Sequence, residues 1–448
     1  MRRLFGTDGI RGKANVYPMT PELALKLGKA IALHFEHKGI APKVVIGKDT
    51  RISGYMLETA LTSGLVSMGA TVLLVGPLPT PAISFLTRAF EANAGIVISA
   101  SHNPAMDNGI KIFDSLGIKL SDDDEGNIES IFFSDELASG GHDGRPIGKA
   151  FRVEDSQQRY REFAKSSIAD VSLKGLKVVA DCANGAGYRV FPQILSELGA
   201  VVSAINDKPD GFNINLNSGA TSIAGLALQV VAQKADVGLA LDGDADRLII
   251  VDALGNEING DKIMALLALH LKEKGLLAKD TVVATVMSNA GFEDYMARNG
   301  ITVVRSRVGD RYIIEEMRRN SYNFGGEQSG HIIFGAYSTT GDGIIAALQF
   351  LAIMLEKGKG ASELANTFEL YPQVLLNVNV KEKRPLGELK ALSSEIREAQ
   401  KLLGNRGRVL VRYSGTENVL RIMVEGENES DINGVAQRIA QAAKEENG

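Results

Sequence analysis

Three aspartates alternate with small residues in the segment 242-DGDADR-247, directly after the apolar run 237-VGLAL-241. Such a run is typical of a buried strand, and in an extended segment the residues at alternate positions point to one side. The carboxylates of Asp242, Asp244 and Asp246 would then repel one another unless a cation lies between them. Hard carboxylate oxygens suit Mg²⁺ or Ca²⁺, so we predict a metal site here.

An EF-hand calcium loop also begins with alternating carboxylates, but it needs glycine at its sixth position and glutamate at its twelfth. This chain has Arg247 and Ala253 at those places, which excludes the calcium loop. The other alternative is a solvated acidic turn, and the apolar run before the aspartates argues against it. We therefore keep a metal site as the prediction for this segment.

A second apolar run, 96-IVIS-99, ends abruptly in a polar loop that contains Ser101, His102, Asn103 and Pro104. Serine, asparagine and proline are common turn formers, so an ordinary turn is one interpretation. The other is a reactive serine that the end of a strand presents to a ligand. This segment alone does not decide between the two.

Basic and hydroxyl-bearing residues gather in the segment 412-RYSGTENVLR-421. Arginine side chains bind phosphate bidentately, and hydroxyls and exposed backbone N–H groups add further donors. The alternative is a hairpin turn flanked by surface arginines, but the density of donors favours an anion site. The candidate binding residues are Arg412, Ser414, Gly415, Thr416 and Arg421.

A glycine-rich segment, 325-GGEQSGH-331, offers a different set of polar groups. Glu327 and Ser329 could share one face of a loop and bind sugar hydroxyls. His331 could contact a ligand, transfer a proton or be a buried structural histidine. Two more basic residues stand near glycines elsewhere, Arg11 in an N-terminal loop and Lys111 shortly after the serine loop.

Three similar units recur along the chain and must position these segments. Each has a strand rich in β-branched residues, a helix that ends at glycine and a second strand, and the first strands begin near residues 43, 177 and 281. Such units predict α/β domains with mostly parallel sheets, which bind ligands at the carboxyl ends of their strands. After about residue 369 the pattern changes to that of a small α+β domain.

We therefore expect four domains, in keeping with a chain of 448 residues, which is too long for a single core. The expected divisions are 1–150 with the serine loop, 151–254 with the metal loop, 255–368 with the sugar-binding loop and 369–448 with the phosphate-binding segment.

Composition excludes several classes of protein. The net charge is −5 without a long basic run, so we expect neither a nucleic-acid nor a membrane partner. The single cysteine, Cys182, fits a reducing cytosol, and the N-terminus lacks the apolar stretch of a secretory signal. The longest apolar stretch, 344–355, is shorter than a membrane helix needs and predicts a buried core helix.

Five segments taken together resemble the α-D-phosphohexomutase family, in the family's order and over the full chain. The matching segments are FGTDGIRG, SASHNP, DGDADR, GEQSGH and RYSGTEN. The resemblance implies three similar mixed α/β domains and a C-terminal α+β domain like the TATA-binding protein, around a central cleft. It also implies a cytoplasmic isomerase, with a phosphoserine at Ser101 that holds Mg²⁺ together with the three aspartates.

Within the family, GEQSGH favours the members that interconvert glucosamine 6-phosphate and glucosamine 1-phosphate, because members acting on mannose and glucose phosphates more often carry GEMSGH. The implied reaction passes through glucosamine 1,6-bisphosphate and supplies amino sugar for the bacterial cell wall. Arg11, Arg247 and Lys111 are candidates to stabilise charge, and Lys111 and His331 are candidates for proton transfer.

Two alternatives remain at this point: a mutase for glucose or mannose phosphates, and a non-catalytic sensor of sugar phosphates. The presence of Ser101 and all three aspartates weakens the sensor, since a sensor could lose them. The expected partner is a small phosphosugar, and the chain is expected to be a monomer or a homodimer.

Overall fold

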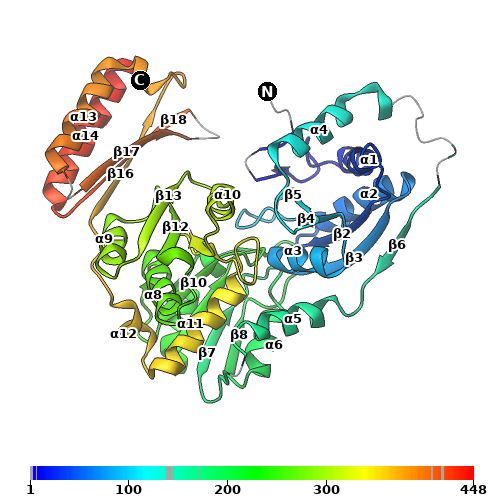
Figure 1. The fold of residues 1–448 in the computed structure, drawn as a ribbon, viewed down its shortest axis with the longest axis horizontal. Helices are drawn as coiled ribbons and strands as arrows, with labels where there is room; N and C mark the ends of the chain where they lie inside the picture. The colour runs from blue at the N-terminus through cyan, green and yellow to red at the C-terminus, as the bar shows by residue number, and fades with distance from the viewer. Residues whose placement is uncertain are drawn as a thin grey trace. The chain divides into compact units, whose positions relative to one another are not determined.

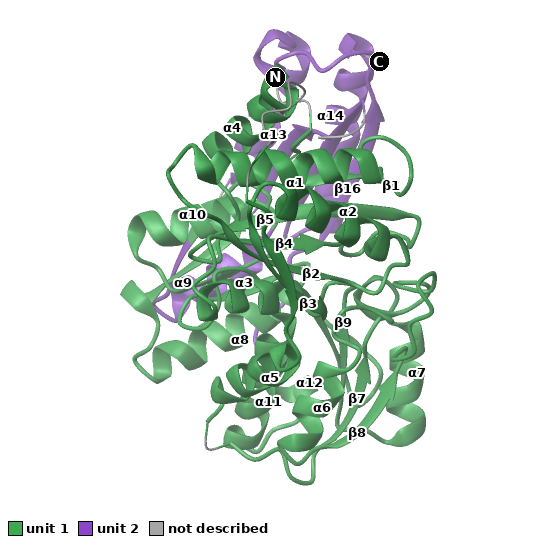
Figure 2. Cartoon of the chain, turned by 90° about the vertical axis from the view of Figure 1, so that its right-hand side faces the viewer, with its two compact units in different colours: residues 1–287, 304–366 green, residues 288–303, 367–448 purple. Residues whose placement is uncertain are grey.

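The computed structural model describes residues 4–6, 8–137, 144, 146–169, 171–404, 407–414 and 418–447. The chain divides into two compact units, which are coloured separately in Figure 2. Unit 1 contains residues 1–287 and 304–366, and unit 2 contains residues 288–303 and 367–448. We describe each unit by itself.

The first sheet of unit 1 has six strands and holds the serine loop at the end of one of them (Figure 1). In spatial order they are β1 (Ile10–Lys13), β5 (Asp107–Asp114), β4 (Ala94–Ile98), β2 (Lys43–Lys48), β3 (Thr71–Pro77) and β6 (Lys149–Arg152). Strands β2, β3, β4 and β6 pair in parallel, whereas β1 and β5 are antiparallel to their neighbours. The associated helices are α1 (Pro21–Glu36), α2 (Ser53–Ser67), α3 (Thr80–Ala89) and α4 (Asp122–Phe133).

Helix α1 shows how the local sequence sets an element. The Thr20 side chain accepts the Leu23 N–H at 3.3 Å, and Pro21 occupies the first helical position. Its apolar face, which includes Leu27 and Ile31, is fully buried in the core of this sheet. The cap and the apolar face thus set this helix, which ends at Glu36.

The second sheet has five strands and carries the aspartate loop. Its order is β11 (Glu257–Ile258), β10 (Leu248–Asp252), β9 (Val237–Leu241), β7 (Lys177–Asp181) and β8 (Val201–Ile205). Strand β7 pairs in parallel with β8 and β9, and β10 is antiparallel to β9. The nearby helices are α5 (Ser156–Ser166), α6 (Val190–Glu197) and α7 (Ala224–Gln233).

The third sheet carries the GEQSGH loop between two short strands. Its order is β13 (Thr302–Ser306), β12 (Thr281–Thr285), β14 (Phe324–Gly326) and β15 (Ile332–Phe334). The remaining helices of unit 1 are α8 (Gly260–Glu273), α10 (Asp310–Asn320), α11 (Gly343–Lys357) and α12 (Ala361–Ala365). Helix α11 contains the apolar stretch 344–355 and is buried along most of its length, which confirms the predicted core helix. Among the described residues, no helix is long and apolar enough to cross a membrane.

Unit 2 contains a small antiparallel sheet with two helices side by side (Figure 1). The strands are β16 (Gln373–Asn379), β18 (Val419–Gly426) and β17 (Gly407–Tyr413), in that order, and the helices are α13 (Lys390–Leu403) and α14 (Glu429–Asn447). Helix α9 (Ala290–Arg298) also belongs to this unit. Three mixed α/β sheets and a small antiparallel one confirm the predicted fold class, although antiparallel strands interrupt the sheets that we expected to be mostly parallel.

Candidate active site

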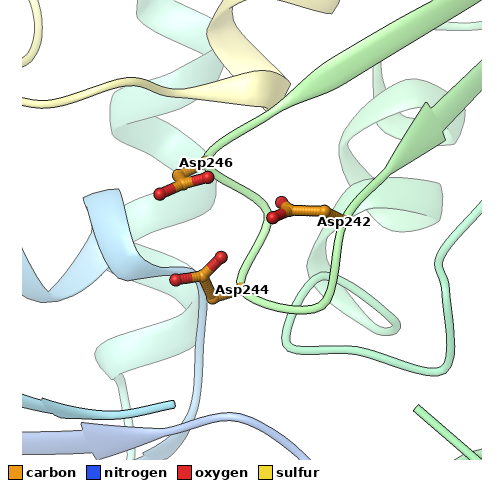
Figure 3. A group of neighbouring side chains, drawn as sticks. All are labelled: Asp242, Asp244 and Asp246. Carbon is orange, nitrogen blue, oxygen red and sulfur yellow. The ribbon is translucent and has the colours of Figure 1, made fainter. Parts of the chain in front are cut away.

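The three aspartates come together in a tight loop after β9, as Figure 3 shows. One oxygen from each of Asp242, Asp244 and Asp246 lies within 4.8 Å of the others. We had assumed that this segment is extended, but it is not. It turns because the Ala245 N–H donates to the Asp242 carbonyl at 3.0 Å and Ala245 has a φ of 60°. The predicted cluster is present, but a turn rather than strand alternation produces it.

The cluster is fully buried and strongly charged. Burial and the neighbouring carboxylates of Asp246 and Asp244 raise the pKa of Asp242 well above its usual range. Burial also acts to raise the pKa of Asp244, but the Lys111 ammonium outweighs it, so this pKa is lowered. Among the described residues, Asp244 Oδ1 and Asp246 Oδ1 have no hydrogen-bond partner. Buried carboxylate oxygens without donors fit a divalent cation such as Mg²⁺.

Ser101 lies beside this cluster. Its hydroxyl donates to Asp242 Oδ2 at 2.8 Å, and the residue is only 2% exposed. The Ser101 hydroxyl oxygen is also 3.2 Å from His102 Nδ1. Gly243 allows the two loops to approach, because a Cβ at that position would collide with the Ser101 carbonyl. The structure therefore joins the serine loop of the first sheet to the aspartate loop of the second.

Arg51 holds the serine loop in place through hydrogen bonds, and the sequence analysis did not identify this residue. Its side chain is completely buried, and Nε donates to Asp49 Oδ2 at 2.8 Å. The guanidinium also donates to backbone carbonyls of the serine loop, those of Ser101, Asn103, Pro104 and Asp107. The Asp49 carboxylate accepts the Ser99 hydroxyl at 2.6 Å, and this hydroxyl accepts the Ser101 N–H at 2.9 Å. The segment 49-DTR-51 at the carboxyl end of β2 was the available signal.

Lys111 points from β5 into the same cluster. Its ammonium lies 3.0 Å from Asp244 Oδ2 and 3.3 Å from Asp8 Oδ2. Burial acts to lower its pKa, but the surrounding carboxylates, first that of Asp244, raise it above the usual lysine range. Arg11, on β1, pairs with Asp8, and its side chain is 28% exposed. Both basic residues, which the sequence analysis named as candidates to stabilise charge, therefore contact the same carboxylate, that of Asp8.

Arg247 and His331 also lie close to the aspartates. The Arg247 N–H donates to Asp242 Oδ1 at 3.2 Å, and its Nε lies 3.9 Å from Asp246 Oδ1. His331 is 3% exposed, with Nδ1 at 3.6 Å from Asp246 Oδ1. The Gly341 N–H donates to Nε2 at 3.0 Å, which favours a neutral imidazole with its proton on Nδ1.

The charges around His331 act against that neutral form. Burial lowers the pKa of His331, but the carboxylates of Asp246, Asp310 and Glu327 outweigh it and raise the pKa to about 9. The Gly341 contact and the carboxylates thus favour different protonation states of Nε2. In both states Nδ1 carries a proton that faces Asp246.

The GEQSGH loop ends at His331 and also contains the two candidate sugar-binding residues. Glu327 is 9% exposed, and its Oε1 accepts the Gly309 N–H at 3.1 Å. Ser329 is half-buried. The tight turn is closed by the Gly330 N–H, which donates to the Glu327 carbonyl at 3.0 Å. Both candidate sugar-binding residues thus stand in a loop of unit 1.

The segment 412–421, the candidate for phosphate binding, lies in unit 2. Arg412 on β17 is directly opposite Arg421 on β18, and the Arg421 guanidinium is 3.5 Å from the Ser414 hydroxyl. Burial and the charge of Arg421 lower the pKa of Arg412. Two cations on neighbouring strands suit an anion. Gly415 and Thr416 lie outside the described residues.

Family models match nearly the whole chain. They are those of phosphoglucomutase/phosphomannomutase: alpha/beta/alpha domain I over residues 2–139, domain II over 158–255, domain III over 259–371 and the C-terminal domain over 375–442. The chain belongs to the phosphoglucomutase/phosphomannomutase family. This confirms the family predicted from the sequence motifs.

The curated relatives of this family member are phosphoglucosamine mutases. Those of Myxococcus xanthus and Bdellovibrio bacteriovorus are 53% and 52% identical to it, over 98% and 99% of this chain and 96% and 98% of their own length. They confirm the predicted enzyme class, an isomerase of the mutase type. They do not favour the alternatives of a mutase for glucose or mannose phosphates or of a sensor.

Solved structures of the phosphoglucomutase/phosphomannomutase family share the fold. A family protein from Burkholderia thailandensis has a TM-score of 0.83 at 21% identity, over 99% of this chain and 97% of the other. An N-acetylphosphoglucosamine mutase from Aspergillus fumigatus, solved with GlcNAc-6P and magnesium, has a TM-score of 0.68 at 20% identity, over 100% and 96%.

Proposed function

We propose that this chain interconverts glucosamine 6-phosphate and glucosamine 1-phosphate, and that Ser101 carries the phosphoryl group between them. The observation that supports this most is the Ser101 hydroxyl, which lies 2.8 Å from Asp242 in a buried carboxylate cluster. A serine on an ordinary turn would face solvent rather than three buried acids. The relatives, which are phosphoglucosamine mutases, support the amino sugar as substrate.

Phosphoserine 101 transfers its phosphoryl group to the free hydroxyl of the sugar phosphate. The bond between phosphorus and the serine oxygen breaks, a new bond to the sugar oxygen forms, and the hydroxyl proton passes to a base. The product is glucosamine 1,6-bisphosphate, which reverses its orientation and returns its other phosphoryl group to Ser101. Lys111 and His331 are the candidate acid and base, because both are buried beside the aspartates.

Asp242, Asp244 and Asp246 would hold Mg²⁺, as the oxygens without hydrogen-bond donors suggest. When bound, Mg²⁺ supplies positive charge that stabilises the transferring phosphoryl group. Two complexes of the Aspergillus fumigatus enzyme, one with magnesium and one of a variant with glucose 1,6-bisphosphate, support both the metal and the bisphosphate. Arg11 and Arg247 lie within the same charged region and would stabilise negative charge on the substrate.

The remaining candidates would bind the sugar and its second phosphate. Glu327 and Ser329 would contact ring hydroxyls. The phosphate that is not reacting would be bound by Arg412, Ser414, Gly415, Thr416 and Arg421.

We retain the four domains at 1–150, 151–254, 255–368 and 369–448, a C-terminal fold like the TATA-binding protein and a central cleft as part of the proposal. We also propose a cytoplasmic protein, either monomer or homodimer, that binds a small phosphosugar and neither nucleic acid nor a membrane.

A coupled assay with each hexose phosphate, Mg²⁺ and trace bisphosphate tests this function. We expect the highest kcat/KM for glucosamine phosphates, and equal or better values for glucose 1-phosphate would overturn the assignment. Ser101→Ala should lose the phosphate found by intact-protein mass spectrometry and nearly all turnover. Ser84→Ala is the control, because Ser84 is equally buried in the first domain and its hydroxyl donates to the Gly117 carbonyl at 2.7 Å.

A further inference from the structure

Six side chains from separate segments of unit 1 form a closed ring in which carboxylates alternate with nitrogen-bearing side chains. The members in order are Asp246, Lys111, Asp8, Lys119, Asp310 and His331. Three members of this ring, Lys111, Asp246 and His331, take part in the proposed chemistry. The other three, Asp8, Lys119 and Asp310, have no role assigned so far.

Lys119 joins the two carboxylates of the ring that lie farthest from the metal loop. Its ammonium contacts Asp8 Oδ1 and lies 2.7 Å from Asp310 Oδ2. The side chain is 7% exposed, so these contacts are shielded from water. Asp8 stands in the N-terminal loop and Asp310 at the start of α10, which means that one lysine connects two separate segments.

Each of these carboxylates also lies next to a candidate acid or base. Asp8 Oδ2 lies 3.3 Å from the Lys111 ammonium, and Asp310 Oδ2 lies 3.6 Å from His331 Nε2. Without the Lys119 cation, two partly buried carboxylates would face each other and repel. They would turn toward their remaining cationic partners, and Lys111 and His331 would move with them.

We propose that Lys119 is a positioning residue that holds Lys111 and His331 in their places beside the aspartate loop, through Asp8 and Asp310. The proposal rests on the proposed function, because it assigns Lys119 to the geometry of proton transfer at that site. Lys119 itself reaches none of the three aspartates by any ion pair within the described residues. Its effect must therefore pass through the two carboxylates.

A purely structural role for Lys119 is the competing explanation, since it also links the first and third sheets. Arg311 provides the comparison. It follows Asp310 on α10 and joins the same two regions, with Nη2 at 2.9 Å from Glu125 Oε1 and a further pair to Asp122. It is 19% exposed and, in the part of the chain that the structure describes, has no ion pair with any ring member.

The test compares Lys119→Met with Arg311→Met in the full chain. We expect Lys119→Met to lower kcat roughly ten- to a hundredfold with KM changed by less than about threefold, because positions rather than binding contacts are lost. Lys119→Arg should restore part of kcat, since guanidinium can also bridge two carboxylates. Arg311→Met should lower the melting temperature but leave kcat within about threefold of the unmodified chain. Equal kcat losses in the two Met variants, or an unchanged kcat in Lys119→Met, would overturn the proposal.

A second readout does not depend on the substrate. In chains labelled with ¹⁵N-histidine, the ring-nitrogen signals of His331, assigned with His331→Gln, should shift in Lys119→Met and stay in place in Arg311→Met. If the unmodified chain turned over no hexose phosphate, the proposed function would fail while this shift could still be seen. Unshifted His331 signals in Lys119→Met would refute the positioning role whatever the substrate proves to be.

Discussion

Ser101 occupies a backbone conformation that non-glycine residues seldom adopt, with a φ of 51°. Ala245 in the aspartate loop shares this feature, with a φ of 60°. Strained residues persist only where their surroundings hold them, and they cluster at sites where ligands bind. At the scale of single residues, the two loops that the sequence singled out are therefore among the segments that the fold holds in a strained conformation.

Asp244 offers a test of the metal site, because one of its oxygens is held by Lys111 and Thr80 while Oδ1 has no donor among the described residues. Asp244→Asn removes one negative charge from the cluster and should weaken Mg²⁺ binding, as measured by calorimetry. It should lower kcat roughly a hundredfold or more, since metal-ion charge contributes several kcal/mol to such a transition state. EDTA should abolish the activity of the unmodified chain, and Mg²⁺ should restore it.

Asp252→Asn is the matched control for this experiment. Asp252 is 3% exposed on β10, and its Oδ1 accepts the N–H groups of Leu254 and Asn256, both at 2.9 Å. Its substitution should leave Mg²⁺ binding unchanged. Full activity of chelator-treated enzyme would contradict the metal assignment.

The single residues also show where sequence reasoning ends. Ser101, Lys111 and the three aspartates could be named in advance, because each follows or lies on a strand and carries a chemically distinctive group. Lys119 could not, since its role depends on contacts with segments far away in the chain. For Arg51 the only signal was its place just after a strand, and its contacts are also with a distant segment. Only the packing of the sheets brings those segments together.

At the scale of elements, the serine loop is positioned by a hydrogen-bond chain rather than by its own turn. Ser99 is the link that can be removed most cleanly, because it is fully buried and bonds Asp49 and the Ser101 N–H. Ser99→Ala should lower kcat about tenfold and leave KM unchanged, since it costs one charge-assisted contact that orients Ser101. Ser84→Ala again serves as the control. A raised KM with normal kcat would show that the chain supports binding instead.

The carboxylate of Asp342 caps the N-terminus of helix α11 and should make the stability of the folded chain depend on pH. Asp342 Oδ1 accepts the N–H groups of Ile344 and Ile345, and the Tyr160 hydroxyl donates to the same carboxylate, each at 3.0 Å. Burial nevertheless raises the pKa of Asp342 to about 6, from 3.8. The folded state therefore binds this proton more tightly than the unfolded state, and the associated stability is complete below about pH 4 and lost as the pH rises to about 6.

Asp342→Asn should remove this dependence, because asparagine caps a helix about as well as aspartate but does not titrate. We expect the free energy of unfolding of the unmodified chain, relative to the variant, to fall by on the order of 3 kcal/mol between about pH 4 and pH 6. Urea denaturation at several pH values measures it. A constant difference across this range would contradict the raised pKa.

At the scale of the whole molecule, helix α9 groups with the C-terminal part of the chain. It lies within 255–368, the segment that we propose as one domain, and its contacts place it in unit 2 with residues 367–448. The reason is a set of contacts that no local pattern encodes. Asn289 exchanges two hydrogen bonds with the Tyr371 backbone, both at 3.0 Å, and the Ala290 N–H donates to Glu425 Oε1 at 2.6 Å.

These contacts predict which residues respond together when a ligand binds. Because α9 is bonded to Tyr371 and to β18, residues 288–303 should change their hydrogen exchange in step with 367–448 when bisphosphate is added. Tyr371→Phe removes the hydroxyl that donates to Asp294 Oδ2 at 2.6 Å and should weaken this coupling. Tyr413→Phe is the control, since its hydroxyl lies 3.4 Å from Asn447 and away from α9. If α9 instead exchanged in step with β12 and α10 in the unmodified chain, the group of residues that respond together would begin at residue 367 and exclude α9.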